Sequence, residues 1–422
     1  QGTAGIAGRV QPPDGNHLEE SGGDGGMMWE KVKLGDIATC IQPGPFGSQL
    51  HNSDYSKEGT PIIMPKDIVG GAIVHSGLLK VSEEHVKRLS RHQVYEGNLM
   101  VARKGDVRKC AYITANENGW MTGSDCLKVV LDESKCYPKF IYYQLRSEHI
   151  GRWLEKVSIG ATMPSLNTGL LSGIEMVLPP IEIQKQIAGI LSAYDDLIEN
   201  NQKQIKLLEE AAQRLYKEWF VDLHIPGHEN TKIVDGVPEG WNEKTLSQVA
   251  NVIMGQSPKS EFYNSEKKGL PFHQRVGSYG VRFVMDDIYS TSYTRIAEPN
   301  SILFSVRAPV GRLNITKNKV VIGRGLAAIN QTDGCQSYLY YLLKNKFFKD
   351  NIVGNGSIFA SVSKDELLNQ KFLIPERNLM MQFEKIVSQM DKQIENLDSK
   401  NKKLIEARDR LLPELMSGEV EV

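Results

Sequence analysis

In two long segments of the chain, mostly apolar residues recur in alternating steps of four and three positions, which is the spacing of one helix face. We call these residues the seam of each segment. Each segment begins just after proline, at Pro179-Pro180 and at Pro375, where proline is tolerated. The seam positions are Ile187, Leu191, Tyr194, Ile198, Asn201, Ile205, Leu208, Ala212, Leu215 and Trp219, then Phe383, Val387, Met390, Ile394, Leu397, Asn401, Leu404, Arg408, Leu411 and Leu415. The pattern predicts two helices with coiled-coil seams, each of roughly 40 residues and about 60 Å.

The rest of the chain shows shorter apolar runs bounded by Gly, Pro, Asn and Asp, which are strand signals separated by turns. Examples are Thr60–Met64, Leu99–Ala102, Cys126–Leu131, Ser301–Val306 and Gly325–Ile329. Tyr137–Leu145 and Gln336–Leu343 are instead typical of short helices. We therefore expect globular blocks of mixed α+β structure.

The chain also repeats itself, with a period of about 200 residues that indicates duplicated domains rather than a solenoid. Trp29 recurs as Trp241 at an offset of 212, and Asp195 recurs as Asp391 at an offset of 196. The smaller offset places short insertions in loops of the first copy, where they cost little. The predicted segments are an extension at 1–26, a globular block at 27–178, a central helix at 179–224, a second block at 225–375 and a distal helix at 376–422.

Two such helices in one chain are simplest to explain if they pack on each other, and a pseudo-twofold relation between the copies would make them antiparallel. Each seam contains one asparagine, Asn201 or Asn401, at non-equivalent places. In an antiparallel pair centred between them the two would face each other, and a buried polar pair can fix register. The alternative is that each helix covers only its own block.

Residues 1–26 are rich in Gly and carry charges without an apolar core segment, so we interpret them as a tag or flexible extension rather than a signal peptide. No run approaches 18 consecutive apolar residues, so no membrane span is expected. The five cysteines form no CxxC pair, which favours reduced cytoplasmic thiols over disulfides or a zinc site.

The formal net charge of −1 hides an uneven distribution. Residues 29–178 carry 18 Lys and Arg against 16 Asp and Glu, and residues 241–376 carry 17 against 11. Residues 179–240 carry 6 against 11. The two blocks are therefore the basic parts, at +2 and +6, and the chain either binds nucleic acid weakly alone or shares the phosphate contacts with a partner.

Catalytic motifs are absent from the sequence. It contains no GxxxxGK[ST] phosphate loop, no Asn/Asp-Pro-Pro-Tyr/Phe tetrapeptide, no HExxH and no GxSxG. The short Gly323-Arg324-Gly325 and Gly354-Asn355-Gly356 stretches lack a GxGxxG continuation and are interpreted as turns. The chain is expected to be a non-catalytic protein without a cofactor or metal of its own.

A duplicated block followed each time by a long heptad helix resembles the specificity subunit of Type I restriction–modification systems. The family-like stretches are Trp29–Ala38, Gly44-Pro45-Phe46-Gly47-Ser48, Gly255-Gln256-Ser257-Pro258, the turn from Arg307 to Arg312, and Leu178-Pro179-Pro180. The first block departs from the pattern after Val107, where the expected Gly is missing.

The resemblance implies two tandem target-recognition domains, each reading one half of a split double-stranded DNA sequence. The antiparallel helices would set the distance between the half-sites and dock two methyltransferase subunits that use S-adenosylmethionine. Motor-nuclease subunits using ATP and Mg would join through the methyltransferases, and the complex would act in the cytoplasm.

Arg and Lys suit phosphates and the guanine edge, whereas Asn and Gln can pair with adenine. On this basis the expected DNA-binding residues are Phe46, Gly47, Ser48, Gln49, Lys66, Arg103, Lys104, Arg108 and Lys109 in the first block, and Gln256, Ser257, Lys259, Gln274, Arg275, Ser278, Tyr279, Arg307, Arg312 and Arg324 in the second. For any one of them the alternative is a solvated surface charge, and for Phe46 and Tyr279 it is packing on their own domain.

Three other functions compete with this interpretation. A related specificity chain could serve a fused methyltransferase–endonuclease. A coiled-coil scaffold could bind proteins through its blocks, although the basic second block argues against it. A stand-alone transcriptional regulator is disfavoured because no helix-turn-helix is evident.

Overall fold

The computed structural model describes residues 29–158, 165–227, 232–234, 236–347 and 361–420. The predicted extension at 1–26 lies outside these residues. The chain divides into two compact units, one formed by Gln1–Glu199 with Asn401–Val422 and the other by Asn200–Lys400. We call them unit 1 and unit 2. Both long helices cross the division, and the predicted domain limits stay a prediction.

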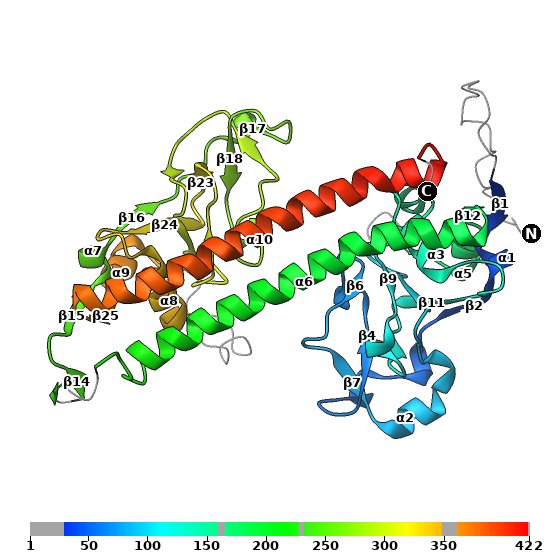
Figure 1. Ribbon diagram of the computed structural model, residues 1–422, viewed down its shortest axis with the longest axis horizontal. Coiled ribbons are helices and arrows are strands. Elements are labelled where there is room, and N and C mark those ends of the chain that lie inside the picture. Colours follow the sequence, from blue (N-terminus) through cyan, green and yellow to red (C-terminus); the bar gives the residue numbers. More distant parts are fainter. Residues whose placement is uncertain (1–28, 159–164, 228–231, 235, 348–360, 421–422) are drawn as a thin grey trace, which may run out of the picture. The chain divides into compact units, whose positions relative to one another are not determined.

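Unit 1 has two four-stranded sheets, in the orders β2-β11-β8-β9 and β10-β4-β7-β3, and two small pairs, β1-β12 and β5-β6. Figure 1 labels β2, β9 and β11 of the first sheet, and β4 and β7 of the second. Its strands are β1 (Glu30–Lys33), β2 (Ala38–Pro43), β3 (Tyr55–Ser56), β4 (Thr60–Ile63), β5 (Ile68–Val69), β6 (Ala72–Ile73), β7 (Leu79–Val81), β8 (Leu99–Ala102), β9 (Cys110–Tyr112), β10 (Met121–Thr122), β11 (Cys126–Leu131) and β12 (Glu175–Leu178). Its short helices are α1 (Leu34–Ile37), α2 (Glu83–Arg88), α3 (Pro138–Leu145), α4 (Glu148–Val157) and α5 (Thr168–Ser172).

Unit 2 has a four-stranded sheet in the order β16-β24-β21-β22, a five-stranded sheet in the order β17-β19-β18-β23-β20, and the pairs β15-β25 and β13-β14. Its strands are β13 (Ile233–Val234), β14 (Val237–Pro238), β15 (Asn242–Thr245), β16 (Ala250–Met254), β17 (Tyr263–Asn264), β18 (Leu270–His273), β19 (Tyr289–Ser290), β20 (Ile296–Ala297), β21 (Ile302–Ser305), β22 (Leu313–Ile315), β23 (Val320–Ile322), β24 (Leu326–Gln331) and β25 (Lys371–Ile374). Its short helices are α7 (Leu246–Val249), α8 (Gln336–Phe347) and α9 (Lys364–Leu368).

The two units share one connectivity, which confirms the duplication and the mixed α/β fold predicted from the sequence. In each, an antiparallel sheet of four strands has the same order, with β2, β11, β8 and β9 corresponding to β16, β24, β21 and β22. In each, one parallel strand pair joins the second sheet: β10 with β4, and β23 with β18. The predicted short helices correspond to α3 and α8.

Helices α6 (Ile181–Phe220) and α10 (Arg377–Ser417) are the two long helices predicted from the heptad pattern. In unit 1 the α6 seam residues Ile187 and Leu191 share a buried core with Leu412 and Leu415 of α10. The burial of these seam residues supplies the tertiary packing from which most helix stability comes.

The helices run antiparallel within unit 1. Asp195 of α6 pairs with Arg408 of α10 at 2.5 Å, and further along α6 the Ile198 carbonyl accepts a hydrogen bond from Asn401 Nδ2 at 3.4 Å. The α10 residue number therefore falls as the α6 number rises. Asn401 is buried, as predicted for a seam position. Its predicted pairing with Asn201 stays a prediction.

Helices α6 and α10 also run antiparallel within unit 2. Arg282 binds both Glu209 of α6 and Asp391 of α10, and further along α6 the Tyr216 ring lies 5.9 Å from the Phe383 ring of α10. This part of the helix pair is covered by an aromatic cluster of buried and partly buried rings, which are Tyr216, Trp219, Phe220, Tyr338, Tyr341 and Phe383. None of the helices in the described part of the chain is long and apolar enough to cross a membrane.

Candidate nucleic-acid interface

Three strand ends of unit 2 bring predicted site residues together. β16 leads into Gly255-Gln256-Ser257, β18 into Gln274-Arg275, and β23 into Gly323-Arg324-Gly325. A Cβ on Gly255 would lie 2.1 Å from the Gly323 carbonyl oxygen, so only glycine allows these loops to approach so closely. The Gln256 amide donates to the Ile322 carbonyl at 2.9 Å, and the Gly323 amide donates to the His273 carbonyl at 2.8 Å.

Side chains of these loops contact one another. Ser257 Oγ accepts hydrogen bonds from Gln274 Nε2 at 3.4 Å and from the Arg324 amide at 3.3 Å. Gln256, Arg275 and Arg324 are exposed. Among the described residues, neither Arg275 nor Arg324 forms an ion pair with a carboxylate. The loops therefore present guanidinium and amide groups whose hydrogen-bonding capacity is largely directed to solvent.

Other predicted residues of unit 2 lie around this group. Arg307 is exposed and follows β21, and its backbone pairs with Ser361. Arg312 is half-buried in the same turn, where its amide donates to Ser305 Oγ at 2.8 Å. Lys259 is exposed and lies 3.8 Å from Glu261.

Ser278 and Tyr279 have structural partners within unit 2. Ser278 Oγ lies 2.9 Å from Nδ1 of the buried His273, whose Nε2 lies 3.1 Å from Asp286 Oδ1. The Tyr279 ring packs against an apolar cluster that includes Leu303 and Val284. Burial raises the pKa of the Tyr279 hydroxyl above its ordinary value, and this hydroxyl has no hydrogen-bond partner among the described residues. The placement favours the packing alternative for Tyr279.

Unit 1 has an equivalent junction, in which two loops at strand ends approach each other closely at glycines. We call this arrangement, in either unit, the glycine-closed junction. A Cβ on Gly44 would lie 1.9 Å from the Gly123 carbonyl oxygen, and the Gly123 amide donates to the Ile63 carbonyl at 2.9 Å. The loop after β2 contains Phe46, which is 54% exposed, and exposed Gly47 and Ser48. Half-buried Gln49 ends this loop, and its carbonyl accepts a hydrogen bond from Arg88 Nη2 at 2.8 Å.

Four of the five predicted basic residues of the first block lie near the loop ends of unit 1, and the fifth, Arg108, lies beside α4. The Arg103 guanidinium carbon lies 5.5 Å from the centre of the Phe46 ring, a cation–π distance. Lys104 pairs with Asp125 at 3.0 Å, and both line an open hollow together with Lys66. Lys109 donates from Nζ to the carbonyl of Pro65, the neighbour of Lys66, at 3.1 Å. Phe46, Lys66, Arg103, Lys104 and Lys109 thus surround the loop ends of unit 1.

Arg108 is bound to helix α4 rather than directed to the loop ends. It pairs with Glu148 and, at 3.5 Å, with Glu155, both on α4. The hydrogen bond to Glu148 is the main cause of a raised pKa for this guanidinium. Arg108 therefore has carboxylate partners within its own unit, which favours the alternative of a surface charge that holds α4.

Asp125 and Thr294 were not among the predicted site residues. Asp125 neutralises Lys104, and Thr294 Oγ1 donates to the Gln256 carbonyl and so holds the loop after β16. The repeat could have indicated Asp125, because it aligns with Gly325, the residue after the candidate Arg324. Both positions directly precede the equivalent strands β11 and β24.

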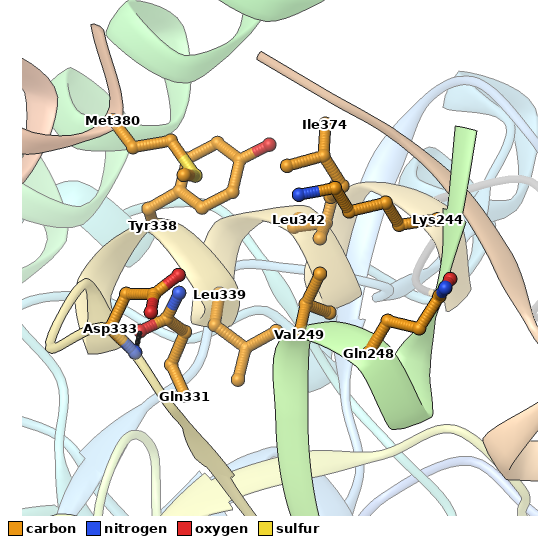
Figure 2. Close-up of a pocket in the computed structure, with 10 residues that line it drawn as sticks. All are labelled: Lys244, Gln248, Val249, Gln331, Asp333, Tyr338, Leu339, Leu342, Ile374 and Met380. Carbon is orange, nitrogen blue, oxygen red and sulfur yellow. Dashed lines mark hydrogen bonds between the residues drawn. The ribbon is translucent and has the colours of Figure 1, made fainter. Parts of the chain in front are cut away.

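The small cavity in unit 2 lies apart from these loop ends. Figure 2 shows Tyr338, Leu339 and Leu342 of α8 around it, with Lys244 and Gln248 from β15 and α7. Its volume of about 20 Å³ leaves space for roughly one water molecule. The Tyr338 hydroxyl is buried without a hydrogen-bond partner in the described part of the chain. Within that part, no group of three or more His, Cys, Asp or Glu side chains is arranged to hold a metal.

The fold and the loops together define a duplicated two-block protein that presents arginine, lysine and glutamine at matching strand ends. The chain belongs to the family described as the Type I restriction modification DNA specificity domain, whose model matches residues 27–210 and 238–407. Specificity subunits of this family are non-catalytic.

Individual relatives support this assignment along nearly the whole length. The chain is 28% identical to a Methanocaldococcus jannaschii protein described as the MjaX type I restriction enzyme specificity subunit, over 93% of this chain and 94% of that protein. It is 24% identical to the MjaIX specificity subunit of the same organism, with the same coverage. The structure of the Type-I restriction-modification system S subunit from M. genitalium has the same fold, with a TM-score of 0.54, 17% identity and coverage of 92% of this chain and 96% of that chain.

Proposed function

We propose that this chain reads a bipartite double-stranded DNA target in a Type I restriction–modification complex, with one half-site bound by the loop ends of each unit. The observation that carries the proposal is the junction of unit 2, where Gln256, Gln274, Arg275 and Arg324 come from three separate strand ends. Arginine can bind guanine through two hydrogen bonds, and glutamine can bind adenine in the same way.

The duplicated architecture explains why the target would have two parts. The same glycine-closed junction occurs in both units, but the side chains on it differ: Phe46 and Lys66 in unit 1, and Gln256 and Arg275 in unit 2. Each unit would therefore read its own sequence, and the helices would fix the spacing between the two half-sites. Both blocks have a net positive charge in the sequence, which supports phosphate contacts.

The long helices are the proposed docking surface for two methyltransferase subunits. Large apolar side chains remain exposed on them, among them Ile190 (36%), Leu197 (52%), Leu207 (64%), Met381 (45%) and Ile386 (42%). Exposed apolar residues on a surface that also carries acidic residues suit a protein partner better than DNA. S-adenosylmethionine would bind to the methyltransferase, and ATP and Mg to a motor-nuclease subunit that joins through it.

Selection of DNA from a random duplex library tests the proposal. The chain is co-expressed with the methyltransferase encoded beside it, the complex is purified, and bound duplexes are sequenced. We expect two short motifs separated by a fixed non-specific gap. A purified complex that enriches no motif, or only one continuous motif, would contradict bipartite reading. Failure of the two proteins to co-purify would contradict docking and leave a scaffold for other proteins as the better account.

A further inference from the structure

The loop after β18 connects the candidate interface of unit 2 to the long helices. We call residues 274–286 the recognition loop. It begins with Gln274 and Arg275 at the strand-end junction, and Arg282 follows Arg275 by seven positions. The loop closes on itself where the Met285 amide donates to the Ser278 carbonyl at 2.8 Å.

Arg282 extends from this loop into a buried site between the helices. Its side chain is 2% exposed, and Nη2 lies 2.5 Å from Asp391 Oδ1 of α10. Nη1 lies 3.5 Å from Glu209 Oε1 of α6 and 3.3 Å from the Tyr341 hydroxyl of α8. The guanidinium carbon lies 3.8 Å from the centre of the Tyr340 ring, which is a close stacking contact.

The backbone around Arg282 is fixed as well. The Ile315 amide of β22 donates to the Arg282 carbonyl at 3.0 Å, and the Val284 amide donates to the Ile315 carbonyl at 3.1 Å. Asn314 Nδ2 donates to the Gly280 carbonyl at 3.0 Å. The Ser278 amide donates in turn to the Arg275 carbonyl at 3.4 Å, so backbone hydrogen bonds connect the two ends of the loop.

Stability alone explains this arrangement poorly. Desolvation commonly offsets the attraction within a buried ion pair, so well-packed apolar residues can be equally stable there. The Arg282 Nε is also buried without a hydrogen-bond partner among the described residues, which adds to the cost. A role in fixing geometry accounts better for a charged residue at this position.

Unit 1 makes the same connection with different residues. Asp195, the repeat partner of Asp391, accepts a hydrogen bond from the Tyr143 hydroxyl at 2.7 Å, and Arg146 Nη1 lies 3.9 Å from it. Arg146 Nη2 donates in turn to the Gly70 carbonyl at 3.0 Å, in the turn between β5 and β6. Both units therefore link the segment that follows the equivalent strand, β4 or β18, to the equivalent helix aspartate, although the arginines come from different elements.

We propose that Arg282 is a positioning residue for sequence recognition, which holds the recognition loop on the long helices through Asp391 and Glu209. It does not contact DNA itself. This inference rests on the proposed function in one respect, namely that the loop contributes Gln274 and Arg275 to base reading. The helix aspartate Asp195 has the same role in unit 1, where Arg146 is its link to the turn at Gly70.

Hydrogen exchange on the full chain tests the positioning role without DNA. Arg282→Met removes the charge and keeps most of the volume. We expect amides of residues 276–286 to lose about 100-fold in protection, because two carboxylates lose their buried partner. The control is Lys371→Met, which removes an ion pair of unit 2 outside the recognition loop, between Lys371 Nζ of β25 and Glu243 Oε1 of β15 at 2.7 Å. Unchanged loop protection in Arg282→Met, or an equal loss in Lys371→Met, would overturn the proposal.

A double variant covers the case in which Arg282→Met fails to fold. Arg282→Met with Asp391→Asn removes the charge of the carboxylate nearer to Arg282, leaving only Glu209 unpaired, so the unit should fold while the loop stays released. A folded double variant with a fully protected loop would overturn the inference. With the methyltransferase present, Arg282→Met should broaden the bases of one half-site and leave the other unchanged, whereas broadening of both would indicate a general defect. Absence of any motif from the unaltered chain would count against the proposed function alone, because the exchange result does not depend on it.

Discussion

Unit 1 and unit 2 share their strand order and their glycine-closed junctions, but they differ in how the charges at those junctions are paired. In unit 1, Lys104 is neutralised by Asp125 at 3.0 Å. In unit 2 the equivalent of Asp125 is Gly325, and Arg307 in the place of Lys104 has no ion-pair partner in the described part of the chain. The sequence charges of +2 and +6 show the same contrast. The glycines that close the junction are therefore kept in both copies, while the charged residues beside them vary.

The cores of the two units differ as well. In unit 2 the long helices contribute aromatic rings to the core, such as Phe220 and Phe383. The residues that they contribute to the core of unit 1, such as Leu415 and Ile187, the repeat partner of Phe383, carry no ring. Aromatic side chains bury more area and prefer specific ring orientations. The two units are thus expected to respond differently to changes in the same repeat position.

The largest expected effect comes from truncating Phe383. This side chain is fully buried and its ring lies 5.2 Å from Phe220 and 5.9 Å from Tyr216. Phe383→Ala should destabilise unit 2 by about 3–5 kcal/mol. Backbone amides in the strands of unit 2 should then exchange hydrogen faster, while those in the strands of unit 1 change less. Ile187→Ala should speed exchange in unit 1 more than in unit 2. Equal loss of protection in both units after either change would contradict separate cores.

Unit 1 contains a buried histidine, His92, that should make the stability of this unit sensitive to acid. His92 is 3% exposed, and its Nε2 accepts a hydrogen bond from Arg91 Nε at 3.1 Å. Burial, with the charges of Arg91 and Lys128, lowers the pKa of His92 from 6.5 to about 4. The unfolded chain therefore takes up a proton between these values while the folded chain does not. Stability contributed by neutral His92 is present above pH 6.5 and is lost as the pH falls toward 4.

Urea unfolding at about pH 7 and about pH 4.5 measures this effect, which amounts to roughly 2–3 kcal/mol for a group with that shift. The His92→Gln variant removes the titrating group, so its stability should change less between the two conditions. If the variant and the unaltered chain lose the same stability on acidification, His92 is not the cause.

A half-site effect of intermediate size is expected for Arg275. Arg275→Ala should reduce discrimination at one or two base pairs by about 1–3 kcal/mol, in the half-site read by unit 2 only. Lys268→Ala is the control, because this exposed lysine pairs with Glu266 away from the junction. Sequenced binding selections with both variants provide the measurement, and a change in both half-sites would show that Arg275 is structural.

The smallest expected effect comes from making unit 1 more like unit 2. Asp125→Asn removes the charge that pairs with Lys104 and keeps the shape. DNA affinity should rise by less than about 1 kcal/mol, because an exposed ion pair has little energy to release. The plot of log affinity against log salt should become steeper by about one phosphate contact. An unchanged slope would mean that Lys104 does not face DNA.

The elements that could be predicted from the sequence are those set by local pattern. The heptad seam predicted helices at 179–224 and 376–422, which the structure has as Ile181–Phe220 and Arg377–Ser417. Helix α4 (Glu148–Val157) was not predicted, although Ile150, Trp153, Leu154 and Val157 have the spacing of one helix face and Ser147 caps its first turn. Local periodicity does not show the surface on which such a helix packs, which here is the core of unit 1, reached by Ile150 and Leu154.

Among the candidate site residues, the sequence could indicate residue types but not partners. Gln274 and Arg324 are 50 positions apart, and only the folded chain shows that both contact Ser257. The sequence also could not separate Arg108, which is bound by Glu148 and Glu155, from Arg307, which lacks such partners among the described residues. These pairings depend on elements distant in the chain, so composition and motif spacing do not determine them.

Genome-wide mapping of N6-methyladenine, in cells that express this chain with the methyltransferase encoded beside it, tests the central claim most directly. We expect a split motif with a fixed non-specific gap and one methylated adenine in each half. Exchanging the unit 2 block for that of a relative should then change only one half of the motif. If soluble, associated proteins produce no new methylation, or if methylation follows a single undivided motif, the two-unit reading of DNA is wrong.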